Sequence, residues 1–417
     1  MASRKTDLYV YADWVGLKGP VLMGVLSAQQ AKGRKAFAFS YDKSWINTES
    51  QRAIDPDIEW FSGPQHPVEK ENFGMITDSM PDTWGRKLMI RREAQTAADE
   101  GRKIKTLYDI DFLLGVYDKT RMGALRFKLD PDGAFLDDND GHPTPPWASV
   151  KELQHAAARL ESDSASSAMK KYLAILLAPG SSLGGARPKA NVMDDQGDLW
   201  IAKFPAKSDL VDKAAWEYLA YELALLAGIQ ISTSKLEKIS GVHHTFFTKR
   251  FDRMGGERIH FSSAMTMTGN TEEKLRDRSA SYLDLALFIQ TYGVNIRENL
   301  HQLWRRLVFN IFISNTDDHL RNHGFILKDK GWILSPAYDL NPSTDKMGLQ
   351  LNVDMYNNAL DIDLARSVGD FFQLTSNDMD AIIGEVATAV SQWKGAATRL
   401  GINRREIELM APAFQHG

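Results

Sequence analysis

The sequence predicts an α+β protein, because strand-like and helix-like patterns dominate different parts of the chain. In the first 130 residues, short apolar runs separated by turn residues are typical of β-strands. After Arg253, apolar residues recur mainly at the three- and four-residue spacing of amphipathic helices. The expected architecture is therefore a β-rich N-terminal part followed by a helical C-terminal part.

Several elements can be placed in order from these patterns. A turn at Gly16–Pro20 separates the first two strand-like runs, LYVYA and VLMGVL. We expect strands at 8–12, 21–26, 36–41, 122–129 and 198–206, a helix over 81–98, and a helix from about 211 that ends at Gly228. The segment 130–147 is rich in Asp, Gly and Pro and indicates a first boundary. The predicted domains are 1–147, 148–254 and 255–417.

Composition limits the classes of function. A hydrophobic content of 43% and a charged content of 25% are typical of a soluble globular protein, and a net charge of −4 gives no global attraction to nucleic acid. The absence of cysteine excludes disulfides and cysteine-based zinc sites, and it fits a reducing cytoplasm. No run approaches the ~18 apolar residues of a membrane helix, and the N-terminus does not look like a signal peptide, so we expect a cytoplasmic protein without a membrane partner.

The segment 313–327, ISNTDDHLRNHGFIL, places a polar cluster directly after an apolar helix over 303–313. Asp317 and Asn322 are five residues apart, which is the spacing of the catalytic Asp and the Mg²⁺-binding Asn in protein kinases. Two other interpretations remain open. These residues are also common in helix caps and turns. His319 and His323 are four apart, but the glutamate of a zinc-binding HExxH motif is missing.

The next segment, GFILKDKGWILSPAYDL, favours the kinase interpretation. It predicts a hairpin of Phe325–Leu327 and Trp332–Leu334, and it ends at Asp339, seventeen residues after Asn322. Protein kinases follow their catalytic loop with a hairpin that delivers a second Mg²⁺-binding Asp. Tyr338 stands here where an apolar spacer is expected. The order of base, amide, hairpin and carboxylate is more specific than any one of these features.

The upstream region offers a cation and a glycine-rich loop. Lys203 is the one lysine in the apolar strand 198–206, and Glu217 on the following helix could be its partner. The alternatives are a lysine that reaches solvent at a sheet edge and an exposed helix glutamate. The loop 178–193 contains Gly180, Gly184 and Gly185 beside Ser181 and Ser182, and its backbone N–H groups could hold phosphates. Because it matches neither common phosphate-binding motif, a simple hairpin turn stays open as well.

Five stretches together resemble the HipA-type serine/threonine-protein kinases, which are the toxins of type II toxin–antitoxin modules. They are SSLGGARPKA, LWIAKFP, FFTKRFDR, NTDDHLRNHGFIL and LSPAYDLNP. DSMPDTWGRKLM (78–89) and MGALRFK (122–128) extend the resemblance to most of the chain. It implies a two-lobed kinase fold related to phosphoinositide kinases, with a β-rich N-terminal subdomain over 1–147, a kinase N-lobe over 148–254 and an all-α C-lobe over 255–417.

The resemblance also implies the role of individual residues. Asp317 would be the catalytic base, Asn322 and Asp339 would bind Mg²⁺, and Ser182, or Ser181 beside it, would be autophosphorylated. ATP would be held by the remaining predicted contacts: Gly184, Gly185, Ala186, Arg187, Lys189, Lys203, Lys249, Phe251, His319 and Tyr338.

The partners implied by the resemblance are a protein substrate and an antitoxin. The substrate would be a translation factor such as an aminoacyl-tRNA synthetase. The antitoxin would be a separate, HipB-like helix-turn-helix protein, through which alone the kinase would contact operator DNA. Two other functions remain open, namely a kinase-like corepressor whose catalysis is dispensable and a small-molecule phosphotransferase.

Overall fold

The computed structural model describes residues 4–31, 34–48, 52–138, 144–162, 173, 176, 185–277 and 280–415. The chain divides into two compact units. The first unit is Met1–Lys207 with Asp252–Ser262, and the second unit is Ser208–Phe251 with Ser263–Gly417. The domain boundaries expected from the sequence, near residues 147 and 254, stay a prediction.

A four-stranded antiparallel sheet forms the base of the first unit, in the order β3-β2-β1-β4. These strands span β1 Arg4–Ala12, β2 Val21–Ala31, β3 Arg34–Tyr41 and β4 Leu125–Lys128, so the four strands predicted in this region are confirmed. Leu8 pairs with Leu26, which in turn pairs with Phe39, and all three side chains are fully buried. One apolar face of the sheet therefore supplies the core of this unit.

Helices and two hairpins, β5–β6 and β9–β10, complete the first unit. They are α1 Lys43–Ile46, α2 Gly74–Asp78, α3 Thr83–Asp99, α4 Asp109–Leu114, α5 Val150–Ser162, β5 Lys189–Met193, β6 Leu199–Lys203, β9 Arg253–Met254 and β10 Glu257–Arg258. Strand β11 covers Phe261–Ser263. The helix predicted over 81–98 is confirmed as α3, which begins where the Asp82 carboxylate accepts a hydrogen bond from the backbone N–H of Gly85.

Two of the quoted sequence stretches meet inside the first unit. The fully buried carboxylate of Asp252 accepts hydrogen bonds from the backbone N–H of Gly123 at 2.8 Å and from Arg253 at 2.6 Å. Arg253 also donates to the backbone oxygen of Arg121 at 2.7 Å. These bonds satisfy a buried charge and join the FDR and MGALRFK stretches to one another within the first unit.

The second unit is mainly helical. Its elements are α7 Lys213–Leu226, β7 Ser234–Glu237, β8 Thr245–Lys249, α8 Ala264–Met267, α9 Lys274–Asp277, α10 Tyr282–Tyr292, α11 Ile296–Phe312, β12 Gly324–Lys328, β13 Gly331–Leu334, α12 Ile362–Ser367, α13 Ser376–Val390, α14 Trp393–Arg399 and α15 Arg404–Met410. The hairpin β12–β13 is the one predicted from the sequence, and it means that the C-terminal region is not purely helical.

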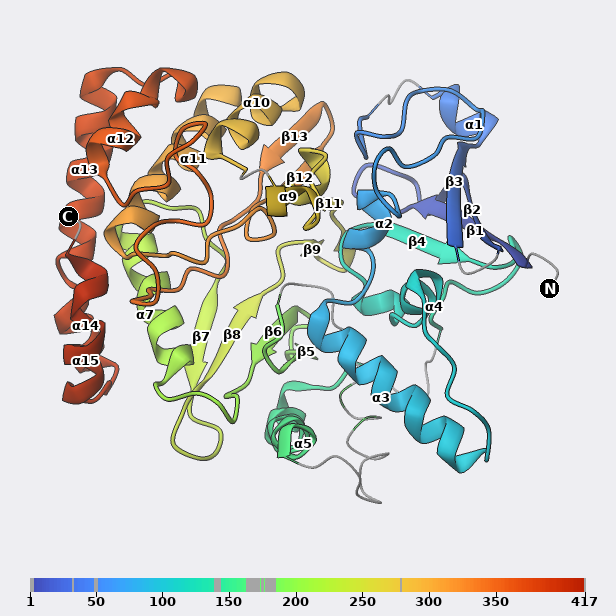
Figure 1. The fold of residues 1–417 in the computed structure, drawn as a ribbon, viewed down its shortest axis with the longest axis horizontal. Helices are drawn as coiled ribbons and strands as arrows, with labels where there is room; N and C mark the ends of the chain where they lie inside the picture. Colours follow the sequence, from blue (N-terminus) through green and yellow to red (C-terminus); the bar gives the residue numbers. More distant parts are fainter. Residues whose placement is uncertain are drawn as a thin grey trace. The chain divides into compact units, whose positions relative to one another are not determined.

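Helix α11 lies at the centre of the second unit, alongside α10 and α13 (Figure 1). Leu303, Trp304 and Leu307 on this helix are fully buried, as are both residues at its next turn, Val308 and Ile311. A helix buried on most of its surface is a rigid base. The loop that follows it is therefore positioned by the core rather than by solvent. Among the described residues, no helix is both long enough and apolar enough to cross a membrane.

Acid should destabilise the first unit through His260. This residue is 3% exposed and stacks on Trp14 with ring centroids 5.2 Å apart. Burial lowers the pKa of the imidazole from 6.5 to about 4. The unfolded chain therefore binds the proton more readily, so the stabilisation is complete above pH 6.5 and is lost as the pH falls toward 4. At about 1.4 kcal/mol per pH unit, the loss reaches about 3 kcal/mol.

Urea unfolding at pH 7 and at pH 4.5 measures this effect. His260→Phe should flatten the pH dependence, because phenylalanine keeps the stack but binds no proton. The matched control is His155→Phe, at an exposed histidine, which should keep the wild-type pH dependence. Equal acid sensitivity in His260→Phe and wild type would show that another group is responsible.

Candidate active site

The candidate catalytic loop begins where α11 ends. Ser314 adopts a left-handed backbone conformation with φ of 49°, and the N–H of Asn315 donates to the carbonyl of Asn310 at 2.8 Å. This bond closes the end of the helix and turns the chain back over it. Asn315 and Thr316 are fully buried, so the loop starts inside the core before it reaches the surface at Asp317.

The two residues that the spacing singled out are brought together. The Nδ2 of Asn322 donates to the backbone oxygen of Asp317 at 3.2 Å, and the backbone N–H of Asn322 donates to the carbonyl of His319 at 2.8 Å. The Asp317 side chain is 73% exposed, and Lys346 lies 3.6 Å from its Oδ1. Asp317 thus presents a carboxylate to solvent, while Asn322, which is 6% exposed, is fixed beside it.

A buried polar cluster lies under the same loop. The Asp318 carboxylate is 1% exposed, and its Oδ2 accepts hydrogen bonds from the hydroxyl of Tyr282 and, at 2.8 Å, from Nε2 of His323. The Nδ2 of Asn310 donates to the same hydroxyl at 2.9 Å. Burial, and then the charge of Asp318, raise the pKa of Tyr282 well above 10. Tyr282 is therefore a neutral donor at any physiological pH.

The hairpin delivers Asp339 in a strained conformation. Asp339 has φ of 60°, which is left-handed, and its Oδ1 accepts a hydrogen bond from Nδ2 of Asn341 at 3.0 Å. Just before it, the N–H of Ala337 donates to the carbonyl of Gln230 at 2.7 Å. After it, the N–H of Ser343 donates to the carbonyl of Ser314 at 3.2 Å. The backbone is thus held before and after Asp339, in a left-handed conformation that Asp and Asn adopt more readily than other residues with a Cβ.

Two predicted nucleotide contacts also meet in the second unit. The rings of Phe251 and Tyr338 have centroids 5.7 Å apart, and the Tyr338 hydroxyl donates to the carbonyl of Arg321 in the catalytic loop at 2.8 Å. Phe251 follows strand β8, which ends at Lys249. Phe251 and the segment after the hairpin are therefore linked to the catalytic loop by ring packing and one hydrogen bond.

The predicted phosphate contacts of the first unit are described in part. Ser181, Ser182 and Gly184 lie outside the described residues. Gly185 and Ala186 are exposed, and Gly185 has φ of 87°, a conformation that glycine adopts at little cost. Arg187 and Lys203 are half-buried, Lys203 at the end of β6.

Lys189 has a structural role that the sequence did not indicate. It is 3% exposed, and its Nζ lies 2.8 Å from the Asp82 carboxylate and donates to the carbonyl of Gly185 at 3.2 Å. Trp84 donates from its indole to the backbone oxygen of Lys189 at 3.1 Å. A lysine charge paired in this way is not presented to solvent. Contact with phosphate remains a prediction for Lys189 and would require this pair to open.

One expectation about Glu217 is wrong. Glu217 is not an exposed helix residue, because its side chain is 6% exposed on the inner face of α7. A buried carboxylate requires a compensating partner. Its pairing with Lys203 remains a prediction.

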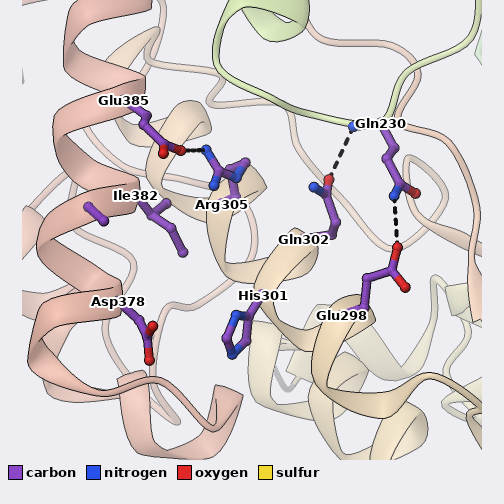
Figure 2. Close-up of a pocket in the computed structure, with 9 residues that line it drawn as sticks. Gln230, Glu298, His301, Gln302, Arg305, Asp378, Ile382 and Glu385 are labelled. Carbon is purple, nitrogen blue, oxygen red and sulfur yellow. Dashed lines mark hydrogen bonds and ion pairs between the residues drawn. The ribbon is translucent and has the colours of Figure 1, made fainter.

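A polar hollow lies between α11 and α13, away from the candidate catalytic loop (Figure 2). It has a volume of about 330 Å³ and contains none of the predicted site residues. Arg305 pairs with Glu385 across it at 2.5 Å, and Gln230 bonds to both Gln302 and Glu298. Its polar side chains are largely satisfied by one another, so the catalytic loop is the better candidate site.

Sequence reasoning missed Lys346, Asp82 and the cluster under the loop. Lys346 is 29 residues from Asp317, and Asp82 is 107 residues from Lys189, so no local spacing links the members of either pair. Asp318 and His323 lay within the quoted loop, but only their burial separates them from Asp317 and Asn322. The sequence signal that could have indicated this cluster was Asp318, a second aspartate directly after the candidate base Asp317.

The residues of the loop fit a magnesium–nucleotide complex. Asn322 and Asp339 provide amide and carboxylate oxygens, which are the ligands that Mg²⁺ prefers. Because Nδ2 of Asn322 is used by the Asp317 carbonyl, its Oδ1 is directed away from that bond. The buried Nδ1 of His319 and Oγ1 of Thr316 find no hydrogen-bond partner among the described residues, which leaves polar capacity for a ligand or water.

Comparison with known proteins agrees with this geometry. A family model described as HipA-like C-terminal domain matches residues 181–393, which is just over half of the chain. The putative kinase Y4dM of Sinorhizobium fredii is 28% identical over 159 residues. That match covers 34% of this chain and only 37% of the relative, so the chain aligns with about a third of the length of that protein.

A solved structure matches almost the whole chain. It is the complex of HipA, HipB and operator DNA from the toxin–antitoxin system of Shewanella oneidensis MR-1. The TM-score is 0.64, and the alignment covers 98% of this chain and 95% of that chain at 17% identity. The predicted α+β fold class is therefore confirmed, with N-terminal sheets followed by a more helical C-terminal region.

The backbone at Asp339 predicts which substitutions the fold tolerates. Asp339→Asn should leave the free energy of unfolding within about 0.5 kcal/mol of wild type, because asparagine accepts the left-handed conformation. Asp339→Val should lower it by about 1–2 kcal/mol, because a β-branched side chain clashes there. Asp345→Val is the control at an exposed aspartate with ordinary φ, and it should have little effect. Equal stability of the two Asp339 variants in urea unfolding would disprove the strain.

Proposed function

The chain belongs to the family defined by the HipA-like C-terminal domain, and from that premise we propose that it is an ATP-dependent serine/threonine-protein kinase that acts as the toxin of a toxin–antitoxin module. The observation that carries the proposal is the loop in which Asn322 is bonded to the backbone of Asp317 while the Asp317 carboxylate stays exposed. Phosphoryl transfer needs a base and a metal-binding amide at adjacent positions.

The proposed reaction moves the γ-phosphoryl group of ATP to a serine or threonine hydroxyl. The hydroxyl oxygen forms the new bond to phosphorus, the bond from phosphorus to the bridging oxygen of ADP breaks, and Asp317 accepts the hydroxyl proton. When bound, Mg²⁺ would neutralise charge on the phosphates, and Asn322 and Asp339 would hold it. Lys203, Arg187 and the backbone of Gly184 and Gly185 would contact the phosphates. Phe251 and Tyr338 would lie beside the adenine ring of ATP.

Lys346, which the sequence did not indicate, supports the assignment of Asp317 as the catalytic base. Its Nζ lies 3.6 Å from Asp317, with 52% of its side chain exposed. A pair this exposed contributes little to stability. It does place a positive charge beside the proposed base, where the transferred group carries negative charge.

The partners are proposed from the composition of the matched Shewanella complex, which contains HipB and operator DNA. We infer a separate HipB-like antitoxin for this chain and contact with operator DNA only through it. The substrate would be a protein of the translation machinery, such as an aminoacyl-tRNA synthetase. Expression of this chain alone should arrest growth, and co-expression of a HipB-like antitoxin should relieve the arrest. Arrest that persists although the antitoxin is bound to the kinase would contradict the pairing.

Asp317→Asn should abolish phosphoryl transfer without unfolding the protein. A positioned base contributes ~10²–10⁴-fold to the rate, so the labelled phosphate transferred from ATP should fall by at least that factor. The control is Asp345→Asn, an exposed aspartate in the same region, which should keep full activity. Near-wild-type transfer by purified Asp317→Asn would refute the mechanism. In the wild type, label on a metabolite would instead indicate a small-molecule phosphotransferase, and no label would indicate a corepressor.

Autophosphorylation of Ser182 should switch the enzyme off. A phosphate adds roughly −1.5 to −2 charges to a loop proposed to bind ATP phosphates, so both would compete for the same N–H groups. Mass spectrometry of the 178–189 peptide after incubation with Mg²⁺-ATP measures the modification. Ser182→Ala should remove it and Ser181→Ala should not. A rate that rises with enzyme concentration would indicate transfer between molecules. An unmodified peptide from enzyme that phosphorylates another substrate would end the proposal.

A further inference from the structure

We propose that Asp318 and His323 form a brace under the candidate catalytic loop, that Tyr282 completes this brace, and that all three are positioning residues for Asp317 and Asn322. The proposal deepens the kinase function proposed above and rests on it. None of these three residues would touch substrate. They would act by fixing the distance between the base and the amide.

The brace follows the same spacing as the proposed catalytic pair. Asp318 and His323 each follow a catalytic candidate directly, so both pairs span five residues of the same loop. They differ in burial, since Asp317 is 73% exposed whereas Asp318 and His323 are 1% and 2% exposed. The loop thus presents one pair outward and joins the other pair inside the protein.

The contacts of the brace are side chain to side chain. Nε2 of His323 lies 2.8 Å from Oδ2 of Asp318. An ionised carboxylate only accepts, so this nitrogen carries the proton. The Tyr282 hydroxyl donates to the same oxygen, and the Tyr282 ring packs edge-on against the imidazole with centroids 5.6 Å apart. One carboxylate oxygen therefore joins the two ends of the loop to helix α10.

Further bonds fix the brace to rigid elements. Asn310 of α11 donates to the Tyr282 hydroxyl at 2.9 Å and accepts from Nδ2 of Asn315 at 3.0 Å. The carbonyl of His323 accepts from the N–H of Ala264, the first residue of α8, at 2.9 Å. The loop is thus tied to three helices by groups that are buried, and buried bonds are not weakened by competition with water.

A brace of this kind is not required for stability. Apolar side chains of similar volume often stabilise a core as well as buried ionic groups do. What the polar cluster adds is a fixed geometry, because each hydrogen bond constrains both direction and distance. Catalysis depends on such geometry, and displacement of a reacting group by about 1 Å can lower a rate ~100-fold.

Single-atom and ring-conserving variants test the brace. Tyr282→Phe removes only the hydroxyl, and His323→Phe keeps a ring but no donor. Each should lower kcat by about ten- to a hundredfold and leave KM for ATP within about threefold, because the proposed contacts of Arg187, Lys203 and Phe251 with ATP lie outside the brace. Tyr292→Phe is the matched control on the same helix, where the side chain is 49% exposed, and it should behave as wild type. His323→Gln should recover most of the activity, because its amide nitrogen can take the place of Nε2.

A double-mutant cycle separates the brace from the proposed function. Asp318→Asn combined with His323→Phe should cost no more than the worse single variant, both in kcat and in the urea midpoint of unfolding. If the wild-type protein transfers no phosphate, the kinase proposal fails, and the unfolding cycle alone decides whether the brace exists. Additive effects in that cycle, wild-type kcat in Tyr282→Phe, or His323→Gln no better than His323→Phe would each overturn the brace.

Discussion

The hydrogen bonds that close the buried end of helix α11 determine where the candidate catalytic residues lie. The last carbonyl groups of a helix have no partner within it and must find one when they are buried. Here Asn310 accepts from the N–H of Asn315, and Ser314 supplies the left-handed turn that makes this bond possible. Because α11 is packed on most of its surface, the position of Asp317 is set two residues after a point that cannot move without disrupting the core.

The same requirement to satisfy buried polar groups explains the rest of the second unit's site. The hairpin β12–β13 ends in a segment whose backbone bonds to Gln230, and a tyrosine hydroxyl bonds to the catalytic loop at Arg321. Asp339 follows both attachments and has a φ of 60°, and beyond it the N–H of Ser343 donates to the carbonyl of Ser314 at 3.2 Å. The backbone is therefore held before and after Asp339, and the carboxylate accepts a hydrogen bond from Asn341 and would also bind the proposed metal.

Local sequence patterns predicted the helices and strands and the catalytic pair Asp317 and Asn322. They could not predict the buried cluster of Asp318, His323 and Tyr282 beneath that pair. The strands, helix α3, helix α7 and the hairpin were visible in the sequence because apolar spacing reports which face of an element is buried. Asp317 and Asn322 were visible because their spacing is specific. Three features of the structure join distant parts of the chain. Tyr282 and Asp318 are 36 residues apart, Lys189 and Asp82 are 107 residues apart, and the sheet order β3-β2-β1-β4 places β4 beside β1. Such contacts depend on tertiary packing, which periodicity does not encode.

The Lys189–Asp82 pair changes how the proposed phosphate loop has to be understood. Asp82 begins helix α3 and also neutralises Lys189, while Trp84 of the same helix holds the backbone of strand β5. The carbonyl of Gly185 is bonded to Lys189 and to the N–H of Trp84. From Gly185 onward, the described part of the loop is therefore anchored to α3. A phosphate that reached Lys189 would have to compete with Asp82 for the same ammonium group, and separating this buried ion pair is costly because it removes the compensating charge from each partner.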